Sequence, residues 1–321
     1  MPAVIAPNRA AIKDPEMRTV YADVLENLIR KDKRIVALDA DLMRAIGTFK
    51  LWDQYPDNII ECGIAEANMI GVAAGLSNEG LIPFAHSFGA FASRRDFDQI
   101  FMSCSYANLN VKIIGSDPGV VAQLNGGTHT ANEDIAMMRA VPNMTVLDVT
   151  DVVMARQILP QIAATNGVFY IRYPRCAVPR VYEEGSSFSV GKAVRLRDGK
   201  DLTIIAAGIE VSEALDAADI LQSEGIEARV VDMFTIKPLD ESEVIAAAHE
   251  TGAIVVAENH NCHGGLYSAV AECLAKTCPV KMEQVANKDR FGDVGSLKYL
   301  MEEYGLTAQD IVRKARAVLG R

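Results

Sequence analysis

The sequence has little that would place it in a membrane or in a disulfide-bonded class. No apolar run approaches the roughly 18 residues that a membrane-spanning helix needs. The chain begins MPAVIAPNRAAIKDPEMR, without a basic segment followed by an apolar core, so we predict no signal peptide and a cytoplasmic protein. The six cysteines form no CxxC pair, which argues against zinc or iron–sulfur ligation and favours reduced thiols.

Basic residues are also fewer than acidic residues. Lys and Arg number 32 against 42 Asp and Glu, which leaves a formal net charge of −10. Non-specific nucleic-acid binding rests on neutralising phosphates with basic side chains, so we expect neither nucleic acid nor a membrane as a partner. The sequence contains no fixed-period repeat and no low-complexity segment.

Short Val- and Ile-rich runs alternate with longer amphipathic segments in the first half of the chain. Strands are predicted at 34–39, 58–62, 81–85, 111–116, 145–149 and 168–172. Helices are predicted at about 64–79, 91–107, 132–140 and 150–164. Strands that are apolar on both faces and separated by helices indicate a parallel sheet in an α/β domain.

The same alternation resumes after a stretch that is interrupted by Pro, Gly and Ser. Strands are predicted at 202–208, 228–234, 253–259 and 280–285, with helices at about 210–224, 240–251, 264–276 and 307–319. We therefore predict two α/β domains, each a mostly parallel sheet flanked by helices. Their expected bounds are 1–180 and 196–321, joined by a linker at 181–195.

Polar residues gather where the predicted strands of the first domain end. They are Asp39, Asp41, Glu61, Glu66, His86, Asp117, His129, Arg172 and Arg175. Because ligands bind at the carboxyl ends of strands in open parallel sheets, we expect a site at this edge. Glu66 opens an otherwise apolar helix, where a carboxylate can either serve a ligand or simply complement the helix dipole.

A second polar cluster, Glu258, His260 and His263, lies in the segment ENHNCHGG of the second half. Its spacing fits a glycine-containing turn that caps a helix as well as it fits a metal site. We predict that no metal ligands lie on this chain.

Five segments, in order, resemble the thiamine-diphosphate-dependent transketolase family. They are CGIAEANMIGVAAGL (62–76), PFAHSFGAFASRRDFDQI (83–100), GGTHTANEDIAMMRAVPNM (126–144), FYIRYPR (169–175) and KDRFGDVGSLKYLMEEYGLT (288–307). The resemblance covers about residues 15–318. It implies a pyrimidine-binding domain followed by a transketolase C-terminal domain.

The resemblance implies which residues hold the cofactor. Glu66 matches the glutamate that hydrogen-bonds the aminopyrimidine ring and promotes the tautomer in which the cofactor activates itself. We expect an apolar pocket to keep its carboxyl group partly protonated. Phe88 and Phe91 match the aromatic residues that wall this ring. Asp41 and Ile64 match further cofactor-binding positions, and Asp41 is expected near a neighbouring protomer.

Substrate positions follow from the same resemblance. His129, in GGTH, matches a histidine that faces the reacting end of the sugar and could hydrogen-bond a developing alkoxide, so it is our second catalytic candidate beside Glu66. Arg18 and Arg175 match arginines that grip a sugar phosphate. Arg94 and Asn125 fall at two further substrate-binding positions.

Four residues depart from the family pattern on the substrate side. Asp117 stands where a phosphate-binding histidine is common, and a carboxylate there would repel a phosphate. Asn125 replaces an aspartate that contacts substrate hydroxyls, Ala45 replaces a serine, and Arg94 replaces a tyrosine. The resemblance therefore implies a ketol transfer from a ketose phosphate or related anionic sugar to an aldose acceptor, with a non-standard sugar pair.

The chain resembles only the second half of a transketolase. In that family the cofactor diphosphate is held through Mg²⁺, whose ligands come from a GDG-then-Asn motif that this sequence lacks. We expect an N-terminal partner subunit to supply the diphosphate-binding domain and the Mg²⁺ ligands. A two-plus-two heterotetramer is the predicted assembly.

Two other functions fit parts of the same pattern. The chain could belong to a 1-deoxyxylulose-phosphate-type synthase or be the β subunit of a 2-oxo-acid dehydrogenase, which also carry segments like GIAEANM and YPR. It could instead be a non-catalytic scaffold subunit that keeps the fold. The FGDVGS-to-YGLT ending and the chain length favour the split transketolase.

Overall fold

The first sheet is built by the apolar runs of the first half of the chain, joined by one strand from the second half. In the computed structural model, which describes residues 3–321, its strand order is β10-β5-β6-β4-β3-β1-β2. The strands are β1 (Ile35–Asp39), β2 (Ile59–Glu61), β3 (Ile82–Phe88), β4 (Lys112–Ser116), β5 (Met144–Asp148), β6 (Val168–Tyr173) and β10 (Thr235–Lys237). All pairings are parallel except that of β10, which runs antiparallel to β5 at the edge.

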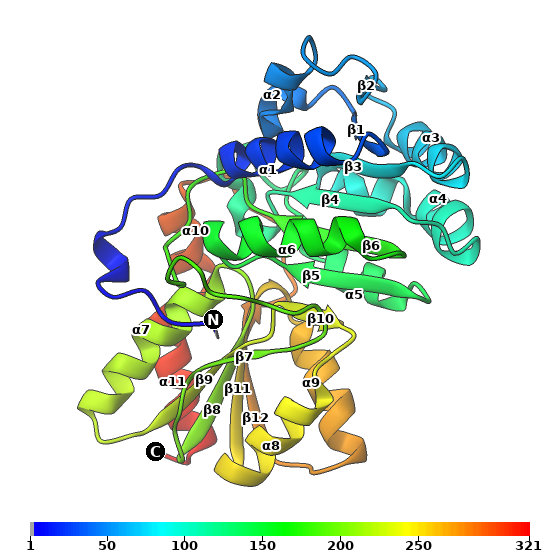
Figure 1. Cartoon of the computed structure of the whole chain (residues 1–321). Coiled ribbons are helices and arrows are strands. Elements are labelled where there is room, and N and C mark those ends of the chain that lie inside the picture. Colours follow the sequence, from blue (N-terminus) through cyan, green and yellow to red (C-terminus); the bar gives the residue numbers. More distant parts are fainter. Residues whose placement is uncertain (1–2) are drawn as a thin grey trace.

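The strands of this sheet are apolar on both faces because helices cover both. Along β1, Ile35 and Ala37 enter one hydrophobic cluster, whereas Val36 and Leu38 enter another. The first cluster includes α1 (Met17–Lys31) and α6 (Val152–Ala164), and the second includes α3 (Glu66–Asn78) and α5 (Asp134–Ala140) (Figure 1). The parallel layered arrangement predicted for this domain is therefore confirmed.

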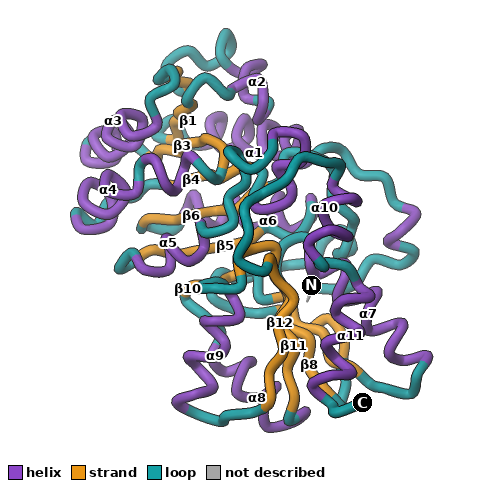
Figure 2. The backbone as a smooth tube through the Cα atoms, turned by 180° about the vertical axis from the view of Figure 1, so that it is seen from behind, coloured by secondary structure: helices purple, strands orange, loops and turns teal. Residues whose placement is uncertain are grey.

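The second sheet lies below the first and has the order β12-β11-β8-β9-β7 (Figures 1 and 2). Its strands are β7 (Val194–Arg197), β8 (Leu202–Ala206), β9 (Ala228–Asp232), β11 (Ala253–Asn261) and β12 (Lys281–Asn287). Its helices are α7 (Glu210–Ser223), α8 (Glu241–Thr251), α9 (Leu266–Lys276), α10 (Leu297–Tyr304) and α11 (Ala308–Val318). Only β7 pairs antiparallel in this sheet of the described chain, so the second α/β domain is confirmed as well.

The helix predicted at 91–107 is not a regular α-helix. The segment 91–107 begins with a π-helical turn at Phe91–Arg95, continues in the short α4 (Phe97–Gln99) and ends in a second π-helical stretch at Ile100–Tyr106. A π turn holds more residues than an α turn, so it widens the helix and changes the direction of the side chains that follow. The remaining short elements are α2 (Met43–Ile46) and 3₁₀ turns at Arg9–Ala11, Thr48–Leu51 and Gly119–Asn125.

The first domain holds the segment that leads to the second domain. Asp151 caps α6 by accepting from the amides of Val153 and Met154 with one carboxylate oxygen. Its other oxygen accepts from the amides of Val181 and Tyr182, in the segment that leads to the second domain. The amino-terminal segment also runs down to α7, as Figure 1 shows.

The buried carboxylate of Glu258 caps a helix of the second domain. Glu258 accepts from the amides of Leu266 (2.6 Å) and Tyr267 (3.0 Å) at the start of α9. Among residues 3–321, no three His, Cys, Asp or Glu side chains are arranged to hold a metal ion. No helix in this part of the chain has the length and apolar character needed to cross a bilayer.

Candidate active site

Glu66 lies at the first position of α3 and is only 2% exposed. Nη1 of Arg95 donates to both of its carboxylate oxygens, at 2.9 Å each, and the hydroxyl of Ser87 donates to Oε1 at 3.4 Å. The expectation of an apolar pocket around Glu66 is therefore wrong, because a charged partner from the adjoining π turn reaches the carboxylate. The Arg95 side chain is 47% exposed, so burial does not prevent it from moving away from Glu66.

Three rings meet beside this ion pair. Phe88 ends β3 and Phe91 opens the π turn, with their ring centroids 6.1 Å apart. The imidazole of His129 lies edge-on to both, with centroids 5.6 Å from Phe88 and 5.1 Å from Phe91. Arg95 closes the group, because its guanidinium lies 4.2 Å from the Phe91 centroid. Two predicted catalytic residues and two predicted cofactor residues thus form one contiguous cluster.

Arg175 extends the cluster on the other side of Phe88. Its guanidinium lies 4.6 Å from the Phe88 ring centroid, and its Nε donates to Asp117 Oδ2 at 2.6 Å. The backbone amide of Arg175 donates to the other oxygen of Asp117 at 3.0 Å. The prediction that the Asp117 carboxylate would repel an anion does not fit this geometry, because Arg175 neutralises that carboxylate and is fixed by it.

A cavity of about 230 Å³ opens next to this pair. Arg18, Arg175, Asp117 and Asn125 all line it, which brings three of the predicted substrate residues to one place. Gln123, on the same wall, has φ 51° and ψ −119°, a backbone conformation that a residue with a side chain rarely adopts. Strained backbone of this kind is common in ligand-binding loops.

The remaining predicted residues lie at the rim. Asp41 follows β1 in a left-handed turn, and its amide donates to Glu61 Oε1 at 2.7 Å. Ile64 is 74% exposed. Arg94 does not join Arg18 and Arg175: it pairs with Glu133 at 2.9 Å and lines a separate cavity of about 440 Å³ against the second domain.

Two features of the site were missed by reasoning from the sequence. One is Arg95, whose only signal was its place beside Arg94 in the segment that follows Phe88 and Phe91. The other is the link between Asp39 and His86, which were predicted only as members of the polar edge: Asp39 Oδ2 lies 3.1 Å from His86 Nδ1, and His86 Nε2 lies 2.9 Å from Ser116 Oγ. All three side chains are buried, so these contacts link β1, β3 and β4 beneath the site and are not open to a substrate.

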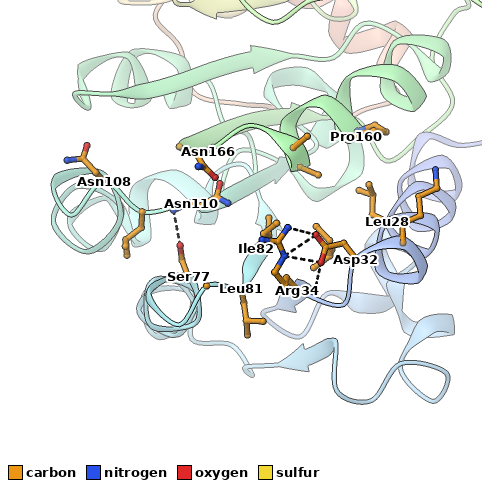
Figure 3. A pocket seen from close by; sticks show the side chains of 17 residues that line it. Leu28, Asp32, Arg34, Ser77, Leu81, Ile82, Asn108, Asn110, Pro160 and Asn166 are labelled. Carbon is orange, nitrogen blue, oxygen red and sulfur yellow. Dashed lines mark hydrogen bonds and ion pairs between the residues drawn. The ribbon is translucent and has the colours of Figure 1, made fainter.

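A larger cavity, of about 660 Å³, lies at the opposite end of the first sheet (Figure 3). Arg34 and Asp32 form an ion pair there, and Ser77 accepts from the amide of Asn110 (Figure 3). It lies at the amino ends of the strands and is lined by none of the predicted site residues. Size alone therefore does not locate the active site in this fold.

Comparison with known proteins identifies the family of the chain. Residues 13–180 match the family described as transketolase, pyrimidine binding domain, and residues 191–311 match transketolase, C-terminal domain. The chain belongs to the transketolase family. The resemblance seen in its sequence motifs and the predicted α/β fold are thereby confirmed, and thiamine diphosphate is the cofactor on which this family depends.

Relatives of similar length are named as transketolase subunits. The chain is 50% identical over 315 residues to the 6-deoxy-6-sulfo-D-fructose transketolase subunit SqwH of Clostridium sp. (strain MSTE9), covering 98% of each. It is 36% identical to a subunit of the apulose-4-phosphate transketolase of Phocaeicola vulgatus, over 93% of this chain and 96% of that one. A solved structure described as a split gene transketolase, inactive beta4 tetramer, superposes with a TM-score of 0.89 at 41% identity, covering 96% and 99%.

Proposed function

We propose that this chain is the C-terminal subunit of a split transketolase and moves a two-carbon ketol unit from an anionic ketose to an aldose. The observation that carries this proposal is the contiguous cluster of Glu66, Phe91, Phe88, His129 and Arg175 at the carboxyl ends of the first sheet. One end of the cluster offers a carboxylate and aromatic faces, and the other offers a fixed guanidinium. These are the groups that a flat heterocycle and an anionic sugar require.

The residues present fit the pyrimidine half of thiamine diphosphate. Glu66 would accept or donate at the ring edge, while Phe88 and Phe91 would lie against its faces. When bound, the cofactor supplies the carbanion equivalent that takes up the ketol unit. The diphosphate and Mg²⁺ would be held by an N-terminal partner subunit, because this sequence lacks the GDG-then-Asn motif that supplies the oxygen ligands in the family it resembles.

The residues on the proposed substrate side favour binding of an anionic ligand. Arg175 is oriented by Asp117 and backed by Phe88, so its remaining N–H groups are available to an anion. Arg18 lines the same cavity. A relative with 50% identity is named for a sulfonated ketose, and a sulfonate, like a phosphate, presents three oxygens to arginine. We therefore propose a donor ketose that ends in a sulfonate or a phosphate.

His129 would act at the other end of the donor. Its ring contacts Phe88 and Phe91, the proposed cofactor-binding rings, and this supports a role where the sugar carbonyl would meet the cofactor. From there it could donate a hydrogen bond to the oxygen that gains negative charge.

Calorimetric titration of thiamine diphosphate with Mg²⁺ tests the shared site. We expect no binding to the chain alone and clear binding to a one-to-one mixture with the N-terminal partner. Tight binding by the isolated chain would overturn the split-site proposal. The mass of the mixture in solution would test the proposed two-plus-two heterotetramer, which closed symmetry favours.

A donor panel then separates this proposal from other thiamine-dependent reactions. The mixture should convert a sulfonated or phosphorylated ketose with an aldose acceptor and should not use pyruvate. Product from pyruvate would identify a synthase or dehydrogenase of the alternative kind instead. Absence of product with every donor, despite cofactor binding, would point to a non-catalytic subunit.

A further inference from the structure

The loop that carries His129, here called the His129 loop (residues 118–132), is closed at its neck. The amide of Gly119 donates to the carbonyl of Ala131 at 3.0 Å, and Pro118 and Ala131 form a β-bridge. Within the loop, the amide of His129 and the hydroxyl of Thr130 both donate to the carbonyl of Gly126, at 3.0 Å each. The position of the His129 imidazole therefore depends on the contacts that fix this loop as a unit.

One hold comes from the second domain through Asn259, near the end of β11. Its side-chain oxygen accepts from the amide of Val120, and its side-chain nitrogen donates to the carbonyl of Pro118, both at 2.9 Å. Asn259 is 2% exposed, so both bonds are shielded from water. Gly119 has φ +53°, and a Cβ atom there would meet the Asn259 side chain well inside contact distance.

A second hold is a contact between two glycine-rich loops. The FGDVGS loop (residues 291–296) packs against the tip of the His129 loop, where a Cβ on Gly127 would collide with the carbonyl oxygen of Gly292. A Cβ on Gly292 would collide with the Thr130 side chain and lie 3.0 Å from Gly127 Cα. Val294 closes the contact, since a Cβ on Gly126 would lie 2.7 Å from its Cγ2. At Gly127 and Gly292, backbone thus meets backbone directly.

The loop's carboxyl end is held by the second domain as well. The amide of Asn261 donates to the carbonyl of Asn132 at 2.7 Å, two residues beyond Asn259 on the same strand. The second domain therefore contacts the His129 loop at its start, its tip and its end. In contrast, Phe88, Phe91 and Glu66 lie on elements of the first domain.

We propose that the second domain is a positioning element of the active site, with Asn259 and Gly292 as the residues that set where His129 stands. This inference rests on the proposed function, because it assigns His129 to the reaction. It also gives the FGDVGS loop a role, because its Gly292 allows this loop to pack closely against the tip of the His129 loop. The second domain then acts on substrate turnover and not on cofactor binding.

The test uses the chain assembled with its N-terminal partner. Gly292→Ala adds a methyl group that would collide with the Thr130 side chain and lie 3.0 Å from Gly127 Cα. We expect the Kd for thiamine diphosphate to stay unchanged while kcat/KM for the ketose donor falls by roughly 10- to 100-fold. Lys288→Ala, an exposed change just before the same loop, is the control and should change neither quantity.

A double-mutant cycle with His129→Ala decides whether Gly292 acts through the imidazole. In the His129→Ala background, Gly292→Ala should cost no further activity, because the group it misplaces is gone. Equal losses in both backgrounds would overturn the proposal, as would a loss of cofactor affinity that parallels the loss of turnover. Asn259→Ala approaches the loop from its other end and should give the same pattern if Gly292→Ala does not fold.

The same experiment separates this inference from the proposed function. If His129→Ala alone leaves turnover intact, the role proposed for His129 fails, and the positioning inference fails with it. If His129→Ala removes turnover but Gly292→Ala and Asn259→Ala do not, only the positioning inference is overturned.

Discussion

Arg95 holds Glu66 in the way that a bound heterocycle would. Its Nη1 donates to both carboxylate oxygens at 2.9 Å, and its planar cation lies 4.2 Å from the centroid of Phe91. An aminopyrimidine placed in this site would need the same two contacts, one with the carboxylate and one with the ring face. We therefore expect Arg95 and the proposed cofactor to compete for Glu66 and Phe91, so that Arg95 has to move before the cofactor binds.

Replacing Arg95 by alanine should tighten cofactor binding. The competitor is removed, and Glu66 is left as a buried carboxylate that gains more from a new partner. We expect a lower Kd for thiamine diphosphate in the assembled complex. The isolated variant should also lose roughly 1–3 kcal/mol of unfolding free energy, because the buried Glu66 carboxylate is left without its charged partner. Calorimetry and urea unfolding measure the two effects.

Arg34→Ala provides the matched control for that prediction. Arg34 pairs with Asp32 through its Nη2 at 2.7 Å, but at the opposite end of the sheet. Its loss should leave cofactor affinity unchanged. Weaker cofactor binding by Arg95→Ala would show that Arg95 helps to hold the cofactor and would rule out competition.

Glu66→Gln should abolish turnover while leaving the fold and much of the cofactor affinity intact. The amide keeps the size of the carboxyl group but cannot exchange a proton with the ring edge, so kcat should fall by at least about 100-fold. Phe88 and Phe91 remain to hold the ring. Glu79→Gln, at the far end of the same helix, is the control. Full activity of Glu66→Gln in the complex would remove Glu66 from the mechanism.

The fold could be predicted from the sequence because local and global signals agree in it. Strands such as β1 are buried at every position and apolar up to the final Asp39, and parallel sheets covered on both faces demand that pattern. The helix α1 was not predicted, although Val20, Val24 and Leu25 repeat at helical spacing and are buried in the structure. The strand β10 has only three residues, which is too short for periodicity to mark.

The site was predictable only in part, for a different reason. Which residues face the site depended on motif resemblance, and that resemblance identified Phe88, Phe91 and His129, which the structure brings into contact. It says nothing of a residue such as Arg95, whose direction is set by a π turn. The extra residue in the π turn changes the direction in which Arg95 points, and sequence periodicity does not reveal where such a turn occurs.

Asp96 should make the stability of the chain depend on pH. It is fully buried next to Arg95, and neither oxygen has a hydrogen-bond partner on another described residue. Burial, with a smaller contribution from the Glu66 charge, raises the pKa of Asp96 from 3.8 to about 8. Between pH 3.8 and about pH 8 the folded chain keeps the Asp96 proton, whereas the unfolded chain releases it. The stability that the protonated Asp96 contributes is therefore lost as the pH rises toward 8.

Asp96→Asn removes that dependence, because the amide is neutral at every pH. The free energy of unfolding of the variant, relative to the parent chain, should therefore increase between pH 5 and pH 8, by at most about 1.4 kcal/mol per pH unit. Urea unfolding of both proteins at several pH values measures the difference. A difference that stays constant across this range would mean that Asp96 is already ionised in the folded chain.

Asp117→Ala should weaken binding of the anionic donor specifically. Without Asp117, Arg175 loses the two hydrogen bonds that fix its Nε and its backbone amide. We expect KM for a sulfonated or phosphorylated ketose to rise by roughly 10-fold, the value of one hydrogen bond to a charged group, with kcat little changed. A ketose without an anionic end group should show no change in KM, because it makes no use of the guanidinium.

Asp14→Ala is the matched control for this last prediction. Asp14 accepts from Arg180 Nε at 2.7 Å in a similar pair outside the proposed site. Its loss should cost stability without changing KM for either donor. A KM that rises equally for anionic and neutral donors in Asp117→Ala would mean that Asp117 acts through the shape of the cavity. An unchanged KM for the anionic donor would mean that the anion binds elsewhere than at Arg175.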